Sequence, residues 1–187
     1  MDLDLPPESI QREKSVGMWF DGPTLRVRAH LRDRYLGPDR AETVLHEYRL
    51  DLAVDRETMT VTDACIDPVH LPYAECFAAP DNVDRLVGLA LRPGFTADAL
   101  ARLQGEAGCT HMNSLISDLS VASLFNGYIT LREYEREHGS TPPMPPDTHR
   151  TGICAGWRAG GALATWMESG RGIAPSPIYP TTLGEPS

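Results

Sequence analysis

The first half of the chain contains three segments in which apolar and polar residues alternate with a period of two, at residues 24–33, 43–55 and 58–66. This period is typical of a β-strand with one buried face. The tripeptide Asp55-Arg56-Glu57, between the second and third segments, favours a tight turn. We therefore predict an antiparallel meander of at least three strands. The positions expected on its apolar face are Leu25, Val27, Ala29, Leu31, Tyr48, Leu50, Leu52, Val54, Met59, Val61 and Cys65.

The middle of the chain carries helical rather than strand patterns. Residues 82–90 and 97–104 have apolar residues at helical spacing, with Thr96 as the expected N-cap of the second segment. A long helix is predicted from about His111 to His138, with Gly139 in the C-terminal capping position. Apolar residues surround most of its first half, so we expect that half to be buried.

Prolines and glycines set the expected connections. Pro68 and Pro72 should end the strand region, and residues 67–80 should form an irregular loop. Adjacent glycines at 160 and 161 fit a tight turn better than a helix interior. Residues 153–167 could form a helix by composition, but the two glycines favour a β-hairpin.

These elements give an α+β fold class. We expect a mostly antiparallel sheet, made of the N-terminal meander and the C-terminal hairpin, with a long buried helix and shorter helices packed on one side. The expected organisation is a flexible lead over residues 1–16, a single domain over residues 17–180 and a tail over residues 181–187.

The composition excludes several classes of protein. The chain has 187 residues and a formal net charge of −9, whereas a protein that binds nucleic acid needs a basic face. No stretch approaches the roughly 20 apolar residues of a membrane helix, and the N-terminal residues do not resemble a secretory signal. We therefore expect a cytoplasmic protein that binds neither nucleic acid nor membrane. In a reducing compartment its four cysteines are expected to be packed thiols, metal ligands or nucleophiles.

A cysteine and a histidine stand together at the expected start of the long helix. Gly108 precedes Cys109, Thr110 and His111, so Cys109 or Thr110 should cap the helix and His111 should lie in its first turn. The unpaired amides and the dipole of a helix start favour an anion, which would stabilise a Cys109 thiolate. Cys109 and His111 are therefore candidate catalytic residues, a thiolate nucleophile or base and its partner.

The same two side chains could instead ligate a metal ion. Cys76, in the loop between the sheet and the helices, would supply a third ligand, and three protein ligands are what a catalytic zinc site uses. The candidate metal ligands are thus Cys76, Cys109 and His111, for zinc or iron. Cys154 could join them to make a closed structural site. In the alternative interpretation these residues only pack and form hydrogen bonds.

Polar residues of the strands supply weaker candidates. His30 and His46 are expected on the polar faces of their strands, where either could line a pocket. Four arginines alternate along one strand face and could bind a carboxylate or a phosphate, although a solvated face paired with acids is the simpler interpretation. They are Arg26, Arg28, Arg32 and Arg34.

Three short motifs link the chain to a known family. Residues 72–76 are Pro-Tyr-Ala-Glu-Cys, residues 86–89 are Leu-Val-Gly-Leu, and residues 109–112 are Cys-Thr-His-Met. Together they resemble a bacterial family of proteins of unknown function, the domain-of-unknown-function family 2889, over roughly residues 24–180. A glycine turn and a tryptophan in residues 158–166 are similar to a later strand of that family.

The resemblance implies a functional cluster of Cys76, Cys109 and His111 but no established activity. Members of the family often carry an acidic residue where this chain has Ser114. If that acid is a ligand or a base in the family, the resemblance implies a different chemistry here.

Three classes of function are consistent with these residues. The first is a small enzyme that acts on a small-molecule substrate through a metal ion or a thiolate at the cysteine and histidine cluster. The second is a carrier or scaffold for a metal ion or an iron–sulfur cluster, and the third is a non-catalytic accessory subunit. We rank the enzyme first and leave open whether the chain forms a homo-oligomer.

Overall fold

The computed structural model describes residues 4–139, 155–162, 164 and 165 of the chain. It contains two compact units, Met1–Gly127 and Tyr128–Ser187, which are described separately. The single domain over residues 17–180 stays a prediction.

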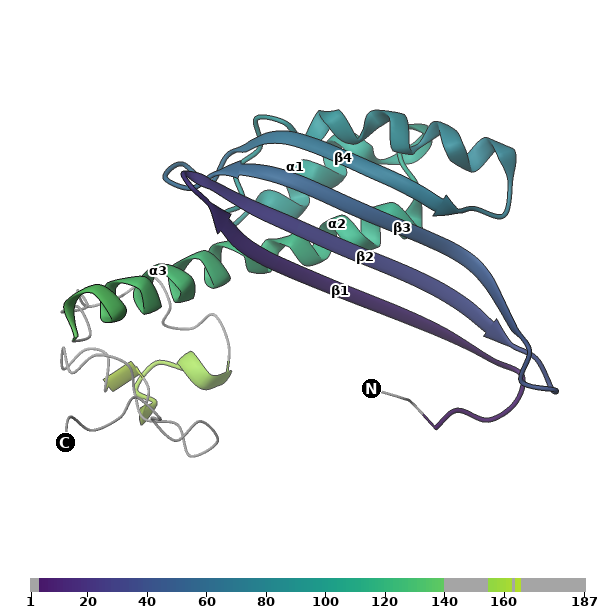
Figure 1. Ribbon diagram of the computed structural model, residues 1–187, viewed down its shortest axis with the longest axis horizontal. Helices are drawn as coiled ribbons and strands as arrows, with labels where there is room; N and C mark the ends of the chain where they lie inside the picture. The colour runs from purple at the N-terminus through teal and green to yellow at the C-terminus, as the bar shows by residue number, and fades with distance from the viewer. Residues whose placement is uncertain (1–3, 140–154, 163, 166–187) are drawn as a thin grey trace. The chain divides into compact units, whose positions relative to one another are not determined.

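The first unit is built on a four-stranded antiparallel sheet with the strand order β1-β2-β3-β4 (Figure 1). The strands are β1 (Ser9–Asp21), β2 (Thr24–Leu36), β3 (Glu42–Asp55) and β4 (Val61–His70). Each pairs with the next along the chain, which confirms the meander.

The first strand was not expected from the alternating pattern. Residues 9–16 pair with β2 over their whole length, so the prediction of a flexible lead over residues 1–16 is wrong for them. β1 is an edge strand, and most of its residues are exposed or half-buried. Its first half, residues 9–15, carries no apolar period, whereas Val16, Met18 and Phe20 alternate in its second half and pack half-buried against the core.

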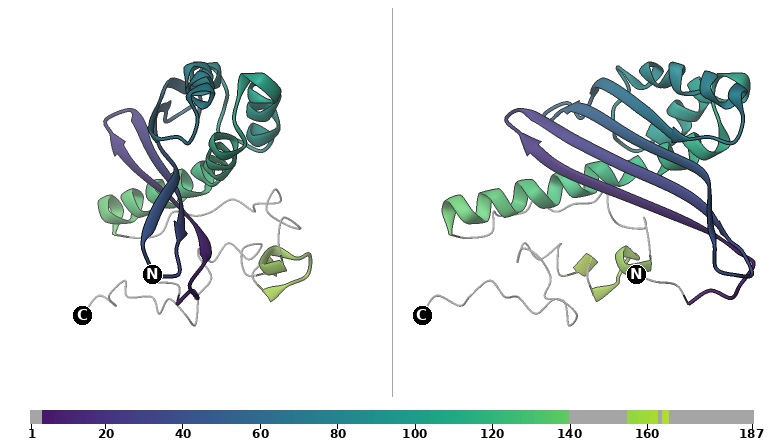
Figure 2. Two further views of the ribbon diagram at one scale, coloured as in Figure 1. Left: turned by 90° about the vertical axis from the view of Figure 1, so that its right-hand side faces the viewer. Right: turned by 45° about the vertical axis from the view of Figure 1, so that its right-hand side comes forward.

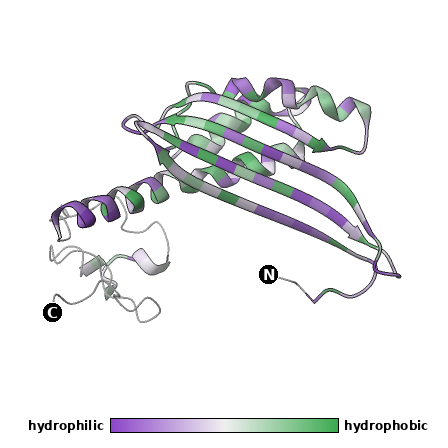
Figure 3. Ribbon diagram, in the orientation of Figure 1, coloured by the Kyte–Doolittle hydropathy of each residue, from purple (hydrophilic) through white to green (hydrophobic). Residues whose placement is uncertain are grey.

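The core lies on the face of the sheet that packs against the helices, which we call the inner face (Figure 2). The alternation is visible along the strands, where hydrophobic and hydrophilic residues follow one another (Figure 3). The predicted apolar positions of β2 and β3 are all buried, at 0–2% exposure. They are Leu25, Val27, Ala29, Leu31, Tyr48, Leu50, Leu52 and Val54.

A β-bulge changes the alternation in β4. Val61 pairs with Val54 but Asp63 pairs with Ala53, so one residue of β4 has no counterpart in β3. Beyond the bulge Ile66 is buried and Cys65 is exposed, and the prediction of Cys65 on the apolar face is wrong. A bulge shifts every later side chain of its strand to the opposite face.

β4 also continues through Pro68 to His70, which corrects the predicted strand end. Proline is tolerated there because β4 is an edge strand. The predicted irregular loop over residues 67–80 is replaced in part by the 3₁₀ helix η1 (Ala74–Ala78).

Short helices follow the sheet. Residues 82–90 were expected to be helical, and the structure has the 3₁₀ helix η2 (Pro80–Leu86), after which Gly88 adopts a positive φ of 83° and Ala90 forms a bridge with Thr60. The helix α1 (Phe95–Leu103) begins after Gly94 rather than at the predicted cap Thr96.

The predicted long helix is present as three consecutive helical segments. After the 3₁₀ turn η3 (Gly105–Ala107), the chain is helical from Thr110 to His138 as α2 (Thr110–Asp118), the 3₁₀ turn η4 (Leu119–Val121) and α3 (Ala122–His138). Burial of the first half is confirmed for Met112, Leu115, Ile116, Leu119 and Ala122, whereas Leu124 and Phe125 are 59% and 40% exposed.

The second unit contains most of α3 and the described part of the C-terminal region. Ala155–Trp157 form the 3₁₀ turn η5, and Ala162, Ala164 and Thr165 are helical. The turn predicted at the two glycines is present, with Gly160 at a φ of 68°, but the β-hairpin is wrong for the described residues because helical segments flank that turn. Further residues of the predicted hairpin lie outside the described residues, among them Ile153, Cys154, Trp166 and Met167.

Among the residues that the structure describes, every helix is too short or too polar to cross a membrane.

Candidate functional site

Three polar side chains form a row across the inner face of the sheet. Arg12 of β1 is the register partner of Asp33 of β2, and Asp33 is the partner of His46 of β3. A β-bulge follows at once, because Arg34 pairs with Val44 and leaves Leu45 without a counterpart. Bulges are common next to sites where a side chain must be aimed.

Arg12 holds the carboxylate of Asp33 with two hydrogen bonds. Its Nε and Nη2 donate to Oδ1 and Oδ2 at 2.6 and 2.7 Å, in the two-pronged geometry that guanidinium and carboxylate groups favour. Asp33 is 4% exposed. Burial acts to raise the pKa of Asp33, but the hydrogen bonds and charge of Arg12 outweigh it and hold the pKa below its usual value. Asp33 is therefore a buried anion.

The start of α2 brings a thiol and an imidazole to this row. Cys109 is the N-cap residue, in extended conformation, and His111 lies in the first turn, as the sequence predicts. Gly108 permits this placement, because a Cβ at that position would lie 1.9 Å from the carbonyl oxygen of Leu103 at the end of α1. Only a residue without a side chain allows such an approach of two backbone segments.

The two ring nitrogens of His111 face different partners. Nδ1 lies 3.6 Å from Sγ of Cys109, and Nε2 lies 3.7 Å from Oδ2 of Asp33. The first distance is within hydrogen-bond range for sulfur, and the second is an ion-pair distance. Thiol, imidazole and carboxylate therefore stand in the order of a nucleophile, a base and the group that orients the base.

His46 stacks on His111. The ring centroids are 3.6 Å apart and the planes are inclined by 18°. Nδ1 of His46 lies 3.5 Å from Oδ2 of Asp33. Burial, followed by the nearby charge of His111, lowers the pKa of His46, and burial also lowers the pKa of His111. Both imidazoles are therefore neutral at neutral pH, and each ring keeps one nitrogen able to accept a proton or bind a metal ion.

Tyr48 lies beneath the thiol. Its side chain is fully buried, and its hydroxyl donates to Sγ of Cys109 at 3.6 Å. Burial raises the pKa of Tyr48, and the hydrogen bond to Cys109 and the charges of Cys109 and Cys76 act in the same direction. The phenol therefore remains a proton donor to the sulfur at every physiological pH.

The structure brings together two of the three predicted ligands, Cys109 and His111. Cys76 is half-buried in η1. Among the described residues, the ligand atoms that lie within 4.8 Å of one another belong to Asp33, His46 and His111, a set that shares His111 with the predicted one. The set of Cys76, Cys109 and His111 stays a prediction, and Cys154 lies outside the described residues.

Sequence reasoning missed Asp33 and misplaced His46. His46 lies on the inner face with Tyr48, so the prediction that it faces the polar side of its strand is wrong. The sequence does contain a signal for both residues. Asp33 lies two positions after Leu31 and His46 lies two positions before Tyr48, so the alternation that predicts the buried face places both on it. A polar residue at a core position is the informative exception to an alternating pattern. No comparable signal marks Arg12.

Ser114 lies at the contact between α2 and β1. Lys14 Nζ is 3.3 Å from both Oγ and the carbonyl oxygen of Ser114, and it forms an ion pair with Asp118 at 2.6 Å. These contacts make position 114 part of the attachment of α2 to the edge strand.

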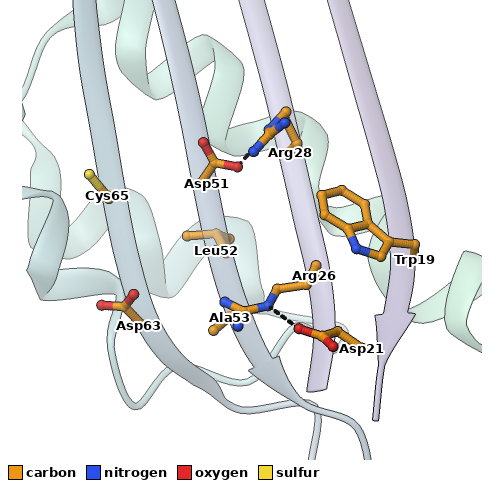
Figure 4. A pocket seen from close by; sticks show the side chains of 9 residues that line it. All are labelled: Trp19, Asp21, Arg26, Arg28, Asp51, Leu52, Ala53, Asp63 and Cys65. Atoms are coloured by element: carbon orange, nitrogen blue, oxygen red, sulfur yellow. Dashed lines mark hydrogen bonds and ion pairs between the residues drawn. The ribbon is translucent and has the colours of Figure 1, made fainter. Parts of the chain in front are cut away.

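The opposite face of the sheet, which we call the outer face, carries the arginines that alternate along β2. Arg28 pairs with Asp51 at 2.7 Å and Arg26 with Asp21 at 3.4 Å, within a shallow pocket that Trp19 also lines (Figure 4). Arg32 and Arg34 likewise have acidic partners, which are Glu42 for both arginines, Glu47 for Arg32 and Glu13 for Arg34. The interpretation as a solvated face paired with acids is confirmed.

The fold and the site define an α+β protein in which a thiol, two imidazoles and a buried carboxylate gather where a helix begins over an antiparallel sheet. Residues 11–124 match the family model described as protein of unknown function (DUF2889), and the chain belongs to this family. The matched region contains all of these groups. Neither the curated proteins nor the solved structures include a significant match to the chain.

Proposed function

We propose that the protein is an enzyme that attacks a small electrophilic molecule with the thiol of Cys109. His111 is the general base and Asp33 orients it. The observation that carries the proposal is the position of the His111 ring, with Nδ1 toward the thiol and Nε2 toward the buried carboxylate. The ring proton then resides on Nε2 beside Asp33, and Nδ1 is free to accept the thiol proton. Separations of this size are usual before substrate is bound, since such contacts tighten in the reacting complex.

Two features support a negative charge on the sulfur. Tyr48 donates a hydrogen bond to Sγ, and the sulfur stands at the N-cap of α2, where the backbone amides of the first turn lack helical partners. A thiolate is the reactive form of cysteine, so each feature favours nucleophilic attack.

The chemistry that fits this arrangement is acyl transfer. The sulfur of Cys109 bonds to the carbonyl carbon of a small ester or thioester while its proton passes to Nδ1 of His111. The bond to the leaving group then breaks, and His111 returns the proton to the leaving group. Water, deprotonated by the same nitrogen, hydrolyses the resulting thioester and restores the thiol.

The first test compares two cysteines within one protein. Cys65 is exposed on the outer face of the sheet and Cys109 is half-buried. In metal-free buffer at neutral pH, we expect iodoacetamide to modify Cys109 at least about tenfold faster than Cys65, as followed by peptide mass spectrometry. Faster modification of the exposed Cys65 would contradict an activated thiol.

The matched variants are His111→Gln and His30→Gln. Replacement of His111 removes the base and should slow the modification of Cys109 by about tenfold or more. His30 lies on the outer face, hydrogen-bonded to Glu47 at 2.9 Å, so its replacement should leave the rate unchanged.

With an activated acyl ester, wild-type protein should gain one acyl group in its intact mass and Cys109→Ser should gain none. An acyl group that persists on Cys109→Ser at the wild-type level would rule out Cys109 as the nucleophile.

A further inference from the structure

We propose that Asp33, His46 and His111 bind a divalent transition-metal ion such as zinc. This inference concerns binding alone and does not depend on the proposed function.

The donor atoms of the three side chains already stand at the separations that a small ion requires. Oδ2 of Asp33 is 3.5 Å from Nδ1 of His46 and 3.7 Å from Nε2 of His111, and one possible ligand atom from each of the three residues lies within 4.8 Å of the other two. Ligands around a tetrahedral zinc ion, with bonds of about 2.0–2.1 Å, are about 3.3 Å apart. The donor separations are thus close to those around a bound ion, and coordination requires the stacked rings of His46 and His111 to move apart so that both nitrogens point at the ion.

His46 gives independent evidence for a ligand. Its Nδ1 is buried and has no hydrogen-bond partner among the described residues. A buried polar atom without a partner costs about 1–3 kcal/mol, so such atoms are rare unless something binds to them. The neighbouring groups that face this nitrogen are the carboxylate of Asp33 and the ring of His111, which are the other two donors.

The donor set suits a borderline metal ion. Two neutral imidazoles and one carboxylate bind zinc in hydrolytic enzymes and ferrous iron in oxygenases, and they leave positions open for water or substrate. Ligating carboxylates are usually held by hydrogen bonds from a second residue, as Arg12 holds Asp33. The positive charge of Arg12 weakens the attraction for a cation, so we expect reversible rather than permanent occupancy.

The binding experiment uses the full-length protein without a histidine tag, stripped with EDTA and dialysed. Calorimetric titration with zinc should show about one site per chain, with native mass spectrometry as the check on stoichiometry. His46→Ala should weaken zinc binding at least about tenfold, and His30→Ala should not change it. Equal zinc binding by wild-type protein and His46→Ala would overturn the site.

Cys109→Ser separates this site from the ligand set of Cys76, Cys109 and His111. Because the sulfur is not a ligand of the proposed site, the variant should still bind about one zinc ion with the wild-type affinity. Loss of the metal in Cys109→Ser would support the cysteine ligands and overturn the inference.

Discussion

Asp33 is a buried carboxylate whose charge depends on one neighbour. It is 4% exposed, and Arg12 engages both of its oxygens. A buried charge is tolerated when it is paired and hydrogen-bonded, and it becomes costly when its partner is removed. Arg12 therefore stabilises the fold and also fixes the carboxylate that faces His46 and His111.

Replacement of Arg12 should destabilise the protein more than replacement of an arginine whose carboxylate partner is exposed, because the partner of Arg12 is buried. Arg12→Met leaves the Asp33 charge without its hydrogen bonds, and we expect the free energy of unfolding to fall by about 2 kcal/mol in urea denaturation. The matched control is Arg28→Met, which breaks the exposed ion pair with Asp51 on the outer face and should cost less than about 1 kcal/mol. Combining Arg12→Met with Asp33→Asn should recover part of the loss, since a neutral amide needs less compensation. Equal losses for the two arginines would argue against a buried charge at Asp33.

The start of α2 is the element that positions the site, and a close approach of backbones determines where it lies. Gly108 lies against the carbonyl oxygen of Leu103, and Asn113 Nδ2 donates to the same oxygen at 2.8 Å. The end of α1 and the first turn of α2 are therefore joined at one point. Cys109 and His111 follow directly, so a displacement there moves both groups.

Gly108→Ala should damage the site and the fold together. The added methyl group would lie 1.9 Å from the oxygen of Leu103, so one of the two backbone segments must shift. We expect a loss of about 1–3 kcal/mol in stability and a slower reaction of Cys109 with iodoacetamide. Gly127→Ala is the control, because Gly127 lies within α3 with nothing within 4 Å of its added Cβ. That substitution should be neutral or stabilising by up to about 1 kcal/mol, with the reaction rate unchanged. If both variants behave alike, the approach to Leu103 does not position α2.

The strands and helices that bury one face could be predicted from the sequence, and those that do not bury a face could not. β2 and β3 were found because core packing imposes an apolar period on them. β1 was missed because its first half, residues 9–15, has no apolar period and is held to β2 by strand pairing rather than by buried apolar side chains. The hairpin at Gly160 was wrong because glycine turns also connect helical segments, and local sequence does not distinguish the two.

The folded molecule as a whole resists protonation of its site. Burial comes first among the causes that lower the pKa of His46 and of His111, and the unfolded chain does not share it. Below the ordinary pKa of histidine, near 6.5, the unfolded state therefore binds protons that the folded state does not. The contribution of these two histidines to the free energy of unfolding is therefore fully present above that pH and is lost as the pH falls below it. The lowered pKa of Asp33 acts in the same direction at more acidic pH.

Acidification should accordingly lower the thermal unfolding temperature in metal-free buffer with EDTA. We expect little change between about pH 8 and about pH 7 and a steady decrease from there to about pH 5, measured by calorimetry. His46→Ala should reduce the slope because it removes one of the shifted groups, whereas His30→Ala, on the outer face, should retain it. A slope that is the same in wild-type protein and His46→Ala would show that the proton uptake occurs elsewhere.

The sequence by itself determined the meander, the α+β class and the helix start that carries Cys109 and His111. These follow from local rules, because alternation, glycine positions and capping act between residues close along the chain. The tertiary structure alone decided which groups face that helix start. Arg12, Asp33 and His46 are far apart in sequence, and strand register makes them neighbours while the packing of α2 on the inner face brings His111 to them. Register and packing depend on the whole core, so the partners of His111 could be identified only after the sheet and the helix had been placed together.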